Sequence, residues 1–272
     1  MKLIPSRNLE FIRRCRGFFF ALGFFFLCGL VIYAPLFDRN ALILGDDVVS
    51  LGYPHVRFYH ESNASWMTQL AGGFAYKTFM MPVHYPAVIL FKILPPGWSM
   101  PLVLLVHFWL AAGGMFLYVR RLGASGAAGF LAAFLYAGGS LFVGNAGQSV
   151  FVIFLALVPW CFWAVERLLD RLDIQSLLIM GLTGGLVLLT VHVQLVLYMT
   201  LVLLVYVPVR MFQVYQESSQ FLRAVPLMVL AALLALAIGS PQLYMARQFQ
   251  KTTSRGGDLS YQDSSFGSLP PE

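Results

Sequence analysis

Residues 100–119 read MPLVLLVHFWLAAGGMFLYV, a run of twenty residues that contains no Asp, Glu, Lys or Arg. About 20 predominantly apolar residues form a helix long enough to cross the hydrocarbon core of a bilayer. This stretch therefore predicts a transmembrane helix, and six other windows are similarly apolar. They are residues 17–36, 125–143, 149–166, 174–191, 193–211 and 223–240.

The composition supports the same fold class. Of the 272 residues, 59% are hydrophobic and 11% are charged, and the mean hydropathy is +0.75. Such values are typical of a chain whose solvent is lipid. We predict an all-α, polytopic integral membrane protein with about seven transmembrane helices. The net charge of +6 would suggest nucleic-acid binding in a soluble domain, but in a membrane protein it reflects basic loops, so no nucleic acid is expected as a partner.

The basic residues predict the orientation of the chain. When seven helices are threaded, eleven of the eighteen lysines and arginines fall on one side, in residues 1–16 and in turns near Arg120, Arg167 and Arg210. By the positive-inside rule this side is cytoplasmic. The prediction divides the chain into a cytoplasmic N-terminus, a first span, an extracytoplasmic loop, a six-helix bundle and an extracytoplasmic C-terminal segment. These parts cover residues 1–16, 17–36, 37–99, 100–240 and 241–272.

The extracytoplasmic loop contains an acidic stretch, Gly45-Asp46-Asp47, followed by Tyr53-Pro54. Placing two adjacent carboxylates beside a bilayer costs free energy, so we expect the pair to have a chemical role. His55, His60 and His84 lie in the same loop. The simpler interpretation, that the outer loops are long and must be polar somewhere, stays open.

Aromatic residues and prolines organise this loop. Within residues 54–79, aromatic side chains stand among polar ones, which suits short helices that lie in the membrane interface. Residues 86–94 are apolar but too short to span a bilayer, and Pro95-Pro96-Gly97 ends them. We predict a structured cap with short interfacial helices.

Several motifs occur in a recognisable order along nearly the whole chain. They are Gly45-Asp46-Asp47, Tyr53-Pro54, Trp66 with Gly72-Gly73, His84-Tyr85-Pro86, Tyr118-Val119-Arg120-Arg121-Leu122-Gly123, Val158-Pro159-Trp160, Gly239-Ser240-Pro241-Gln242-Leu243 and Ser268-Leu269-Pro270-Pro271-Glu272. Their order and spacing resemble the bacterial YfhO-like membrane proteins, members of the GT-C superfamily of multi-pass glycosyltransferases that use polyprenyl-phosphate sugars. The resemblance implies further spans after residue 272, so we expect the chain to be the N-terminal portion of a longer protein.

The resemblance also implies a catalytic carboxylate in the first outer loop. We assign this role to Asp47, with Asp46 as its neighbour or substitute. An acceptor hydroxyl must lose its proton as it attacks the anomeric carbon, and a carboxylate at the membrane edge can take that proton. The pair could also bind a divalent cation, Mg²⁺ or Mn²⁺, that neutralises the leaving phosphate. The alternative is that Asp46 and Asp47 cap a helix or form a hydrated turn.

Other residues of the outer segments are candidates for binding substrates. Arg57, Arg247 and Arg255 could hold the donor phosphate, for which a guanidinium group is well shaped, although contact with lipid headgroups is the alternative. Candidates for orienting the acceptor are His55, His60, His84 and Tyr85. His107 and His192 are expected to be hydrogen-bonded packing residues.

Together with the polar residues of the outer loop, the resemblance implies a glycosyltransferase of the bacterial inner membrane. It would move a sugar from a polyprenyl-phosphate donor to an extracytoplasmic acceptor, either an envelope polymer, a lipid or a protein, and the lipid bilayer would be its other partner. A transporter or flippase of a lipid-linked intermediate is the main alternative, but it would place ionisable groups near the middle of the membrane. A structural assembly partner is the third interpretation.

Overall fold

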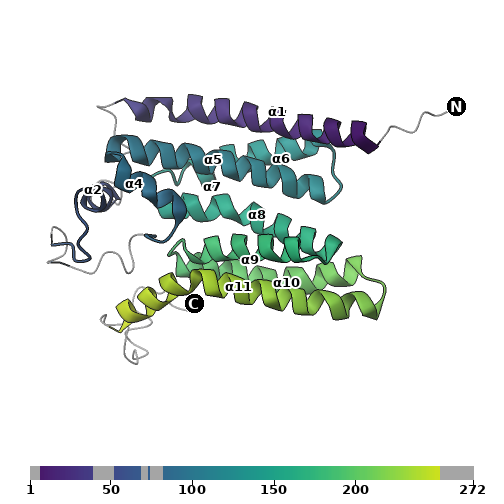
Figure 1. Ribbon diagram of the computed structural model, residues 1–272. Helices are drawn as coiled ribbons and strands as arrows, with labels where there is room; N and C mark the ends of the chain where they lie inside the picture. Colours follow the sequence, from purple (N-terminus) through teal and green to yellow (C-terminus); the bar gives the residue numbers. More distant parts are fainter. Residues whose placement is uncertain (1–6, 39–51, 69–72, 74–81, 252–272) are drawn as a thin grey trace, which may run out of the picture.

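The computed structural model describes residues 7–38, 52–68, 73 and 82–251, and most of these residues are helical (Figure 1). The helices are, in chain order, α1 Arg7–Tyr33, η1 Ala34–Phe37, α2 Tyr53–Glu61, η3 Pro86–Val88, α4 Ile89–Ile93, α5 Pro96–Arg121, α6 Gly126–Gly138, α7 Ser140–Val143, α8 Ser149–Arg171, α9 Ile174–Leu188, α10 Val193–Val214 and α11 Ser218–Gln250.

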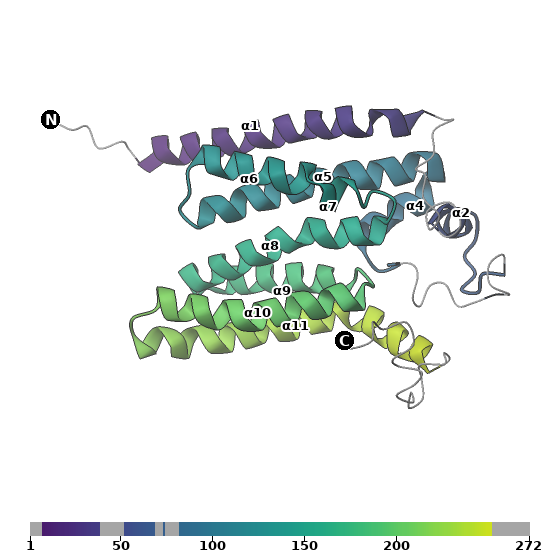
Figure 2. The ribbon, with the colours of Figure 1, turned by 180° about the vertical axis from the view of Figure 1, so that it is seen from behind.

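The long helices lie side by side in one bundle. In both views α1, α5 and α6 form one side of the bundle, α8 lies in the middle, and α9, α10 and α11 form the other side (Figures 1 and 2). About half of the residues of α5 and α8 are buried, including Leu104 on α5 and Ile153 on α8. These two apolar helices therefore form the core on which the others pack.

Six of the described helical segments are long and apolar enough to cross a membrane. They are Gly17–Phe37, Pro96–Arg121, Gly126–Val143, Ser149–Arg171, Val193–Val214 and Ser218–Gln250. The prediction of an all-helical chain with several membrane-length helices is confirmed. The seventh predicted window, residues 174–191, contains the 15-residue helix α9. At about 1.5 Å per residue this helix is about 22 Å long, which is shorter than a typical span.

Two other predicted windows differ in their bounds. The window 125–143 contains two helices, because Gly139 takes an extended conformation (φ −71°, ψ 160°) between α6 and α7. The last window was predicted to end at residue 240, but α11 continues through Pro241 to Gln250. The final part of α11 bends away from the bundle (Figure 1). A helix can continue past a proline with a kink, so the proline does not end α11.

Glycines allow α9 and α11 to approach closely. A Cβ atom added at Gly185 would lie 2.6 Å from Cβ of Ile238, and one added at Gly239 would lie 2.4 Å from Cβ of Leu188. Gly181 faces Leu234 in the same way, at 2.5 Å from its Cδ2. Small residues at a helix interface are the usual means of close packing in lipid, where apolar burial gives little driving force.

We predict that Gly185→Ala destabilises the bundle. The added methyl group would overlap Ile238, and overpacking of this kind costs about 1–3 kcal/mol. The temperature of thermal unfolding, measured in detergent by tryptophan fluorescence, should fall. Gly23→Ala is the matched control, because nothing lies within 4 Å of a Cβ added at Gly23 on α1. Equal unfolding temperatures for the two variants would show that the α9–α11 contact does not depend on the missing side chain.

The short helices α2 and α4 cover one end of the bundle, at the left in Figure 1 and at the right in Figure 2. We call this the loop end. His60 Nδ1 donates a hydrogen bond to the Lys92 carbonyl (3.1 Å), and Lys92 Nζ donates to the carbonyls of Tyr59 (3.0 Å) and Ser62 (3.1 Å). A cation at the C-terminus of α2 satisfies carbonyls that the helix leaves without partners. Lys92 of α4 therefore fastens α2 to the loop end.

Candidate functional site

The predicted catalytic and metal-binding pair, Asp46 and Asp47, lies outside the described residues, and so does Arg255. Among the residues that are described, no group of three or more His, Cys, Asp or Glu side chains could hold a metal ion. The candidate site must therefore be built from the other polar side chains at the loop end.

Two contacts at the loop end involve four side chains, which we call the loop-end row: His84, Tyr85, His107 and Gln242. The ring of Tyr33 at the end of α1 packs against Phe108 of α5, with ring centroids 5.9 Å apart. The preceding residue, His107, contacts the Tyr85 hydroxyl at 3.0 Å, and the neighbouring His84 contacts Gln242 of α11 at 3.3 Å. The loop before η3 thus joins α5 to α11.

The Tyr85–His107 pair anchors this loop in the bundle. His107 is fully buried, and its Nδ1 lies 2.6 Å from the Val103 carbonyl. A carbonyl can only accept, so Nδ1 carries the proton, Nε2 accepts, and the Tyr85 hydroxyl is the donor. Burial raises the pKa of Tyr85, which keeps the hydroxyl protonated. The prediction that His107 is a hydrogen-bonded packing residue is confirmed, and the Tyr85 hydroxyl is occupied by this partner.

The His84–Gln242 contact is the second contact of the row. His84 is exposed, whereas Gln242 is only 2% exposed. The Oε1 atom of Gln242 is 3.3 Å from His84 Nδ1, and its Nε2 atom is buried with no hydrogen-bond partner among the described residues. A buried amide group without a partner is unusual in a folded protein. Gln242 is therefore the residue of the row that has hydrogen-bonding capacity left for a ligand.

Two more buried polar atoms at the loop end lack a partner in the described part of the chain. They are the Tyr33 hydroxyl at the end of α1 and Ser99 Oγ in the first turn of α5. Each belongs to a residue that is at most 2% exposed. Burying a hydroxyl without compensation costs about 1–3 kcal/mol. Buried atoms without a partner also occur at the opposite end of the described bundle, at Arg121 Nε, Arg167 Nε and Ser176 Oγ. The loop end differs in that its unpaired amide, Gln242, contacts the exposed His84.

The predicted binding residues on α2 do not converge. His55 is buried, with 5% of its surface exposed. Arg57 forms an exposed ion pair with Glu61 at 2.9 Å, and His60 bonds to the Lys92 carbonyl. The contacts described here thus fasten His60 to α4 and hold Arg57 on the surface. Of the predicted residues, the structure brings His84 and Tyr85 against the long helices.

His192, at the turn between α9 and α10, is a packing residue. Its ring meets the ring of Phe151 edge-on, with centroids 5.8 Å apart. Burial lowers the pKa of His192, which favours the neutral imidazole. This agrees with the role expected from the sequence.

A second polar cluster occupies the opposite end of the bundle. Arg210 of α10 donates two hydrogen bonds to the carboxylate of Glu166 on α8, at 2.7 and 2.8 Å. The Tyr206 hydroxyl donates to the same carboxylate at 2.5 Å and lies 3.1 Å from the Tyr118 hydroxyl. The carboxylate is satisfied by side chains of the protein, so this cluster holds α10 to α8 and leaves Glu166 little capacity for a ligand.

The sequence analysis missed Gln242 and Lys92 as functional or anchoring residues. Both stand in apolar surroundings, where a polar side chain calls for a partner. Lys92 interrupts the apolar run 86–94, and Gln242 follows a membrane-length run directly after Pro241. That signal could have indicated both residues, although their partners could not be identified from it.

Comparison with known proteins adds no assignment. No protein-family model, curated protein or solved structure matches the chain.

We predict that Tyr85→Phe loosens the loop end. The ring is retained, but His107 Nε2 loses its donor inside the bundle, which costs about 1–3 kcal/mol. The unfolding temperature should fall, and limited proteolysis should cut residues 82–95 faster. Tyr244→Phe is the matched control, because Tyr244 on α11 is 64% exposed. If Tyr85→Phe and Tyr244→Phe behaved alike, the Tyr85–His107 hydrogen bond would not be the anchor.

We predict that Glu166→Ala separates α10 from α8 at the opposite end. Arg210 and Tyr206 both lose their acceptor, and removal of one partner of a largely buried pair costs about 2–3 kcal/mol once the exposure of Arg210 is considered. Asp170→Ala is the control, since Asp170 pairs with Arg121 at 2.7 Å but its side chain is 63% exposed. The loss there should be below about 1 kcal/mol. Equal losses in denaturant titrations would contradict the anchoring role of Glu166.

Proposed function

We propose that this chain belongs to a membrane glycosyltransferase of the GT-C type, which moves a sugar from a polyprenyl-phosphate donor to an extracytoplasmic acceptor. The observation that supports it is the loop-end row, where His84 and Gln242 meet beside buried polar atoms in an otherwise apolar chain. Asp46 and Asp47 fall in the sequence between η1 and α2, and both of these elements contact α5. That the described elements flanking the acidic pair both lie against α5 supports a place for the pair near the loop end.

The reaction needs a base at the acceptor. The acceptor oxygen forms a bond to the anomeric carbon, the bond from that carbon to the phosphate oxygen breaks, and polyprenyl phosphate leaves with the electron pair. The hydroxyl proton passes to Asp47, with Asp46 beside it. A Mg²⁺ or Mn²⁺ ion bound by the pair would neutralise the charge that develops on the leaving phosphate. Displacement in one step inverts the anomeric centre.

The arginines support an orientation with the loop end outside. In the described helices, arginines cluster around the short turns at the opposite end: Arg120, Arg121, Arg167, Arg171, Arg210 and Arg223. By the positive-inside rule this arrangement supports a cytoplasmic location for that end and for the N-terminus. The bacterial plasma membrane is proposed from the family resemblance. On this orientation α2 and the exposed Trp66 lie near the outer headgroups, where aromatic rings are favoured.

The alternative of a transporter or flippase has less support. Such a protein would place ionisable groups or broken helices near the middle of the membrane. In the described helices the buried charged residue is Glu166, which lies one turn from the end of α8 and is paired with Arg210. The glycines inside α9 and α11 make close helix contacts.

We predict that Asp47→Asn in the full-length protein abolishes sugar transfer without reducing its amount in the membrane. The substitution keeps the shape of the side chain but removes its basicity. The measurement is transfer in membrane vesicles from polyprenyl phosphate carrying radiolabelled glucose, galactose, mannose or arabinose in turn.

Glu61→Gln serves as the control, because Glu61 is exposed and its partner is Arg57 on the same helix. Transfer by Asp47→Asn at the rate of the unaltered protein would remove Asp47 as the base. Labelling of cysteines placed at positions 46 and 47 from the cytoplasmic side would contradict the proposed orientation.

A further inference from the structure

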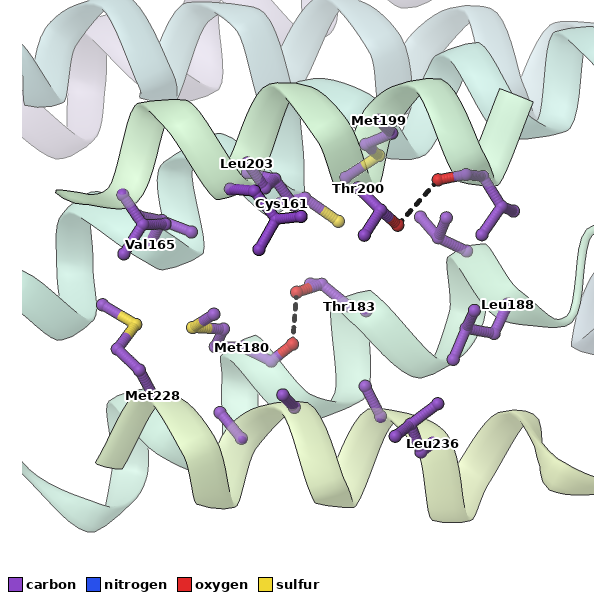
Figure 3. Close-up of a pocket in the computed structure, with 18 of the residues that line it drawn as sticks. Cys161, Val165, Met180, Thr183, Leu188, Met199, Thr200, Leu203, Met228 and Leu236 are labelled. Atoms are coloured by element: carbon purple, nitrogen blue, oxygen red, sulfur yellow. Dashed lines mark hydrogen bonds between the residues drawn. The ribbon is translucent and has the colours of Figure 1, made fainter. Parts of the chain in front are cut away.

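A cavity of about 490 Å³ lies between α8, α9, α10 and α11 (Figure 3). Its wall is apolar and includes Met180, Met199 and Met228 from three different helices. Two threonines in the wall bond to their own helices: Thr183 Oγ1 donates to the Met180 carbonyl at 3.0 Å, and Thr200 Oγ1 donates to the Val196 carbonyl at 2.8 Å. The cavity therefore offers a hydrocarbon environment to whatever fills it.

The loose packing of α10 accounts for this cavity. Of its 22 residues, only Met199 and Met211 are buried. The helix is held near its C-terminus, where Arg210 and Tyr206 bond to Glu166. Between Val196 and Pro208, α10 leaves an apolar space in front of the close α9–α11 pair. We call this space the α10 groove.

The α10 groove leads towards the loop-end row. A second, small cavity of about 40 Å³ shares Leu188 and Val196 with the groove and is also lined by Gln242. The Nε2 atom of Gln242 is buried without a partner in the described residues, and its Oε1 contacts the exposed His84. The α10 groove is apolar and leads to an amide donor without a partner. A lipid, which has a hydrocarbon chain and a polar head, fits this arrangement.

The charges beyond Gln242 favour an anionic head. From Ser218 to Lys251, α11 and its cap contain no acidic residue, and the exposed Arg247 and Lys251 follow Gln242 at the loop end. Basic residues at the membrane surface attract anionic lipids and prefer them to zwitterionic ones.

The size of the groove favours a single fatty acyl chain. A cavity of about 150 Å³ holds one benzene molecule, with its six carbons, so in proportion about 490 Å³ holds roughly 20 carbon atoms. This is close to the number of carbon atoms in one acyl chain of a bilayer phospholipid and far fewer than in a long polyprenyl chain. We propose that the α10 groove binds one acyl chain of an anionic phospholipid, with the headgroup between Gln242, His84 and Arg247.

The test is lipid binding, which does not depend on sugar transfer. The purified full-length protein in detergent is titrated with phosphatidylglycerol or with phosphatidylcholine of the same acyl chains, and bound lipids are counted by native mass spectrometry. One phosphatidylglycerol should bind at a concentration about tenfold below that needed for phosphatidylcholine.

Three variants locate the site. Ala232→Phe places a ring in the groove and should weaken phosphatidylglycerol binding about tenfold, whereas Ala237→Phe makes the same change at an exposed position of α11 outside the groove. Thr200→Phe fills the groove from α10 and replaces Ala232→Phe if that variant does not fold. Gln242→Leu removes the amide and should reduce the preference for the anionic lipid, while Gln248→Leu, at an exposed position, should keep it.

Equal binding of the two phospholipids would overturn the proposal, as would unchanged phosphatidylglycerol binding by both groove-filling variants. Binding of undecaprenyl phosphate that these variants weaken, while phosphatidylglycerol binding is unaffected, would assign the groove to a prenyl lipid and would equally overturn it. Loss of sugar transfer in Asp47→Asn has no bearing on these outcomes, so the two proposals fail separately.

Discussion

The hydrocarbon core of a bilayer provides no hydrogen-bond partner, and this constraint orders the polar groups of the chain. Along the helices a polar side chain can be satisfied only by another group of the protein. The indoles of Trp109 and Trp160 donate across helix interfaces to the carbonyls of Leu22 and Leu110, each at 2.9 Å. Thr190 in the α9–α10 turn donates to the carbonyl three residues before it. Polar groups with capacity to spare are thereby confined to the two ends of the bundle.

The two ends use their polar groups differently. At the opposite end, the carboxylate of Glu166 accepts three hydrogen bonds from Arg210 and Tyr206, so the charge is compensated inside the protein. At the loop end, the row contains one satisfied pair, Tyr85–His107, beside the buried Gln242 amide, of which one atom is unmet. A cluster whose hydrogen-bonding groups all have partners stabilises the fold, whereas a group without a partner can still form a hydrogen bond to a ligand. Buried atoms without a partner among the described residues remain at both ends, since Arg121 Nε, Arg167 Nε and Ser176 Oγ also lack one. The contact between the buried Gln242 and the exposed His84 is what directs attention to the loop end.

The sequence predicts what depends on composition and run length. Membrane-length helices follow from long apolar windows, and the end of α4 follows from the prolines at 95 and 96. The length of α9 could not be predicted, because residues 189–191 are as apolar as the helix before them and Val191 adopts a positive φ of 70°. The contact between His84 and Gln242 joins residues 158 positions apart, and no local pattern encodes such a separation. For the same reason His60 was predicted to bind substrate, although its ring nitrogen contacts the distant Lys92 carbonyl.

Helix α11 connects the two proposals through one side chain. Its glycine contacts with α9 fix the height and rotation of the helix, because Gly239 admits Leu188 three residues before Gln242. Gln242 is thereby held in a defined position between the loop-end row and the small cavity that adjoins the α10 groove. The facing wall, α10, is tied down at its far end. A lipid chain that enters between the fixed helix α11 and the loosely packed helix α10 needs to displace only α10. The headgroup of this lipid would then lie beside the loop-end row, where His84 is exposed. The phosphate of the lipid headgroup would add negative charge next to the proposed glycosyltransferase site. Binding of a lipid in the α10 groove and binding of the anionic polyprenyl-phosphate donor would therefore be coupled by electrostatic repulsion.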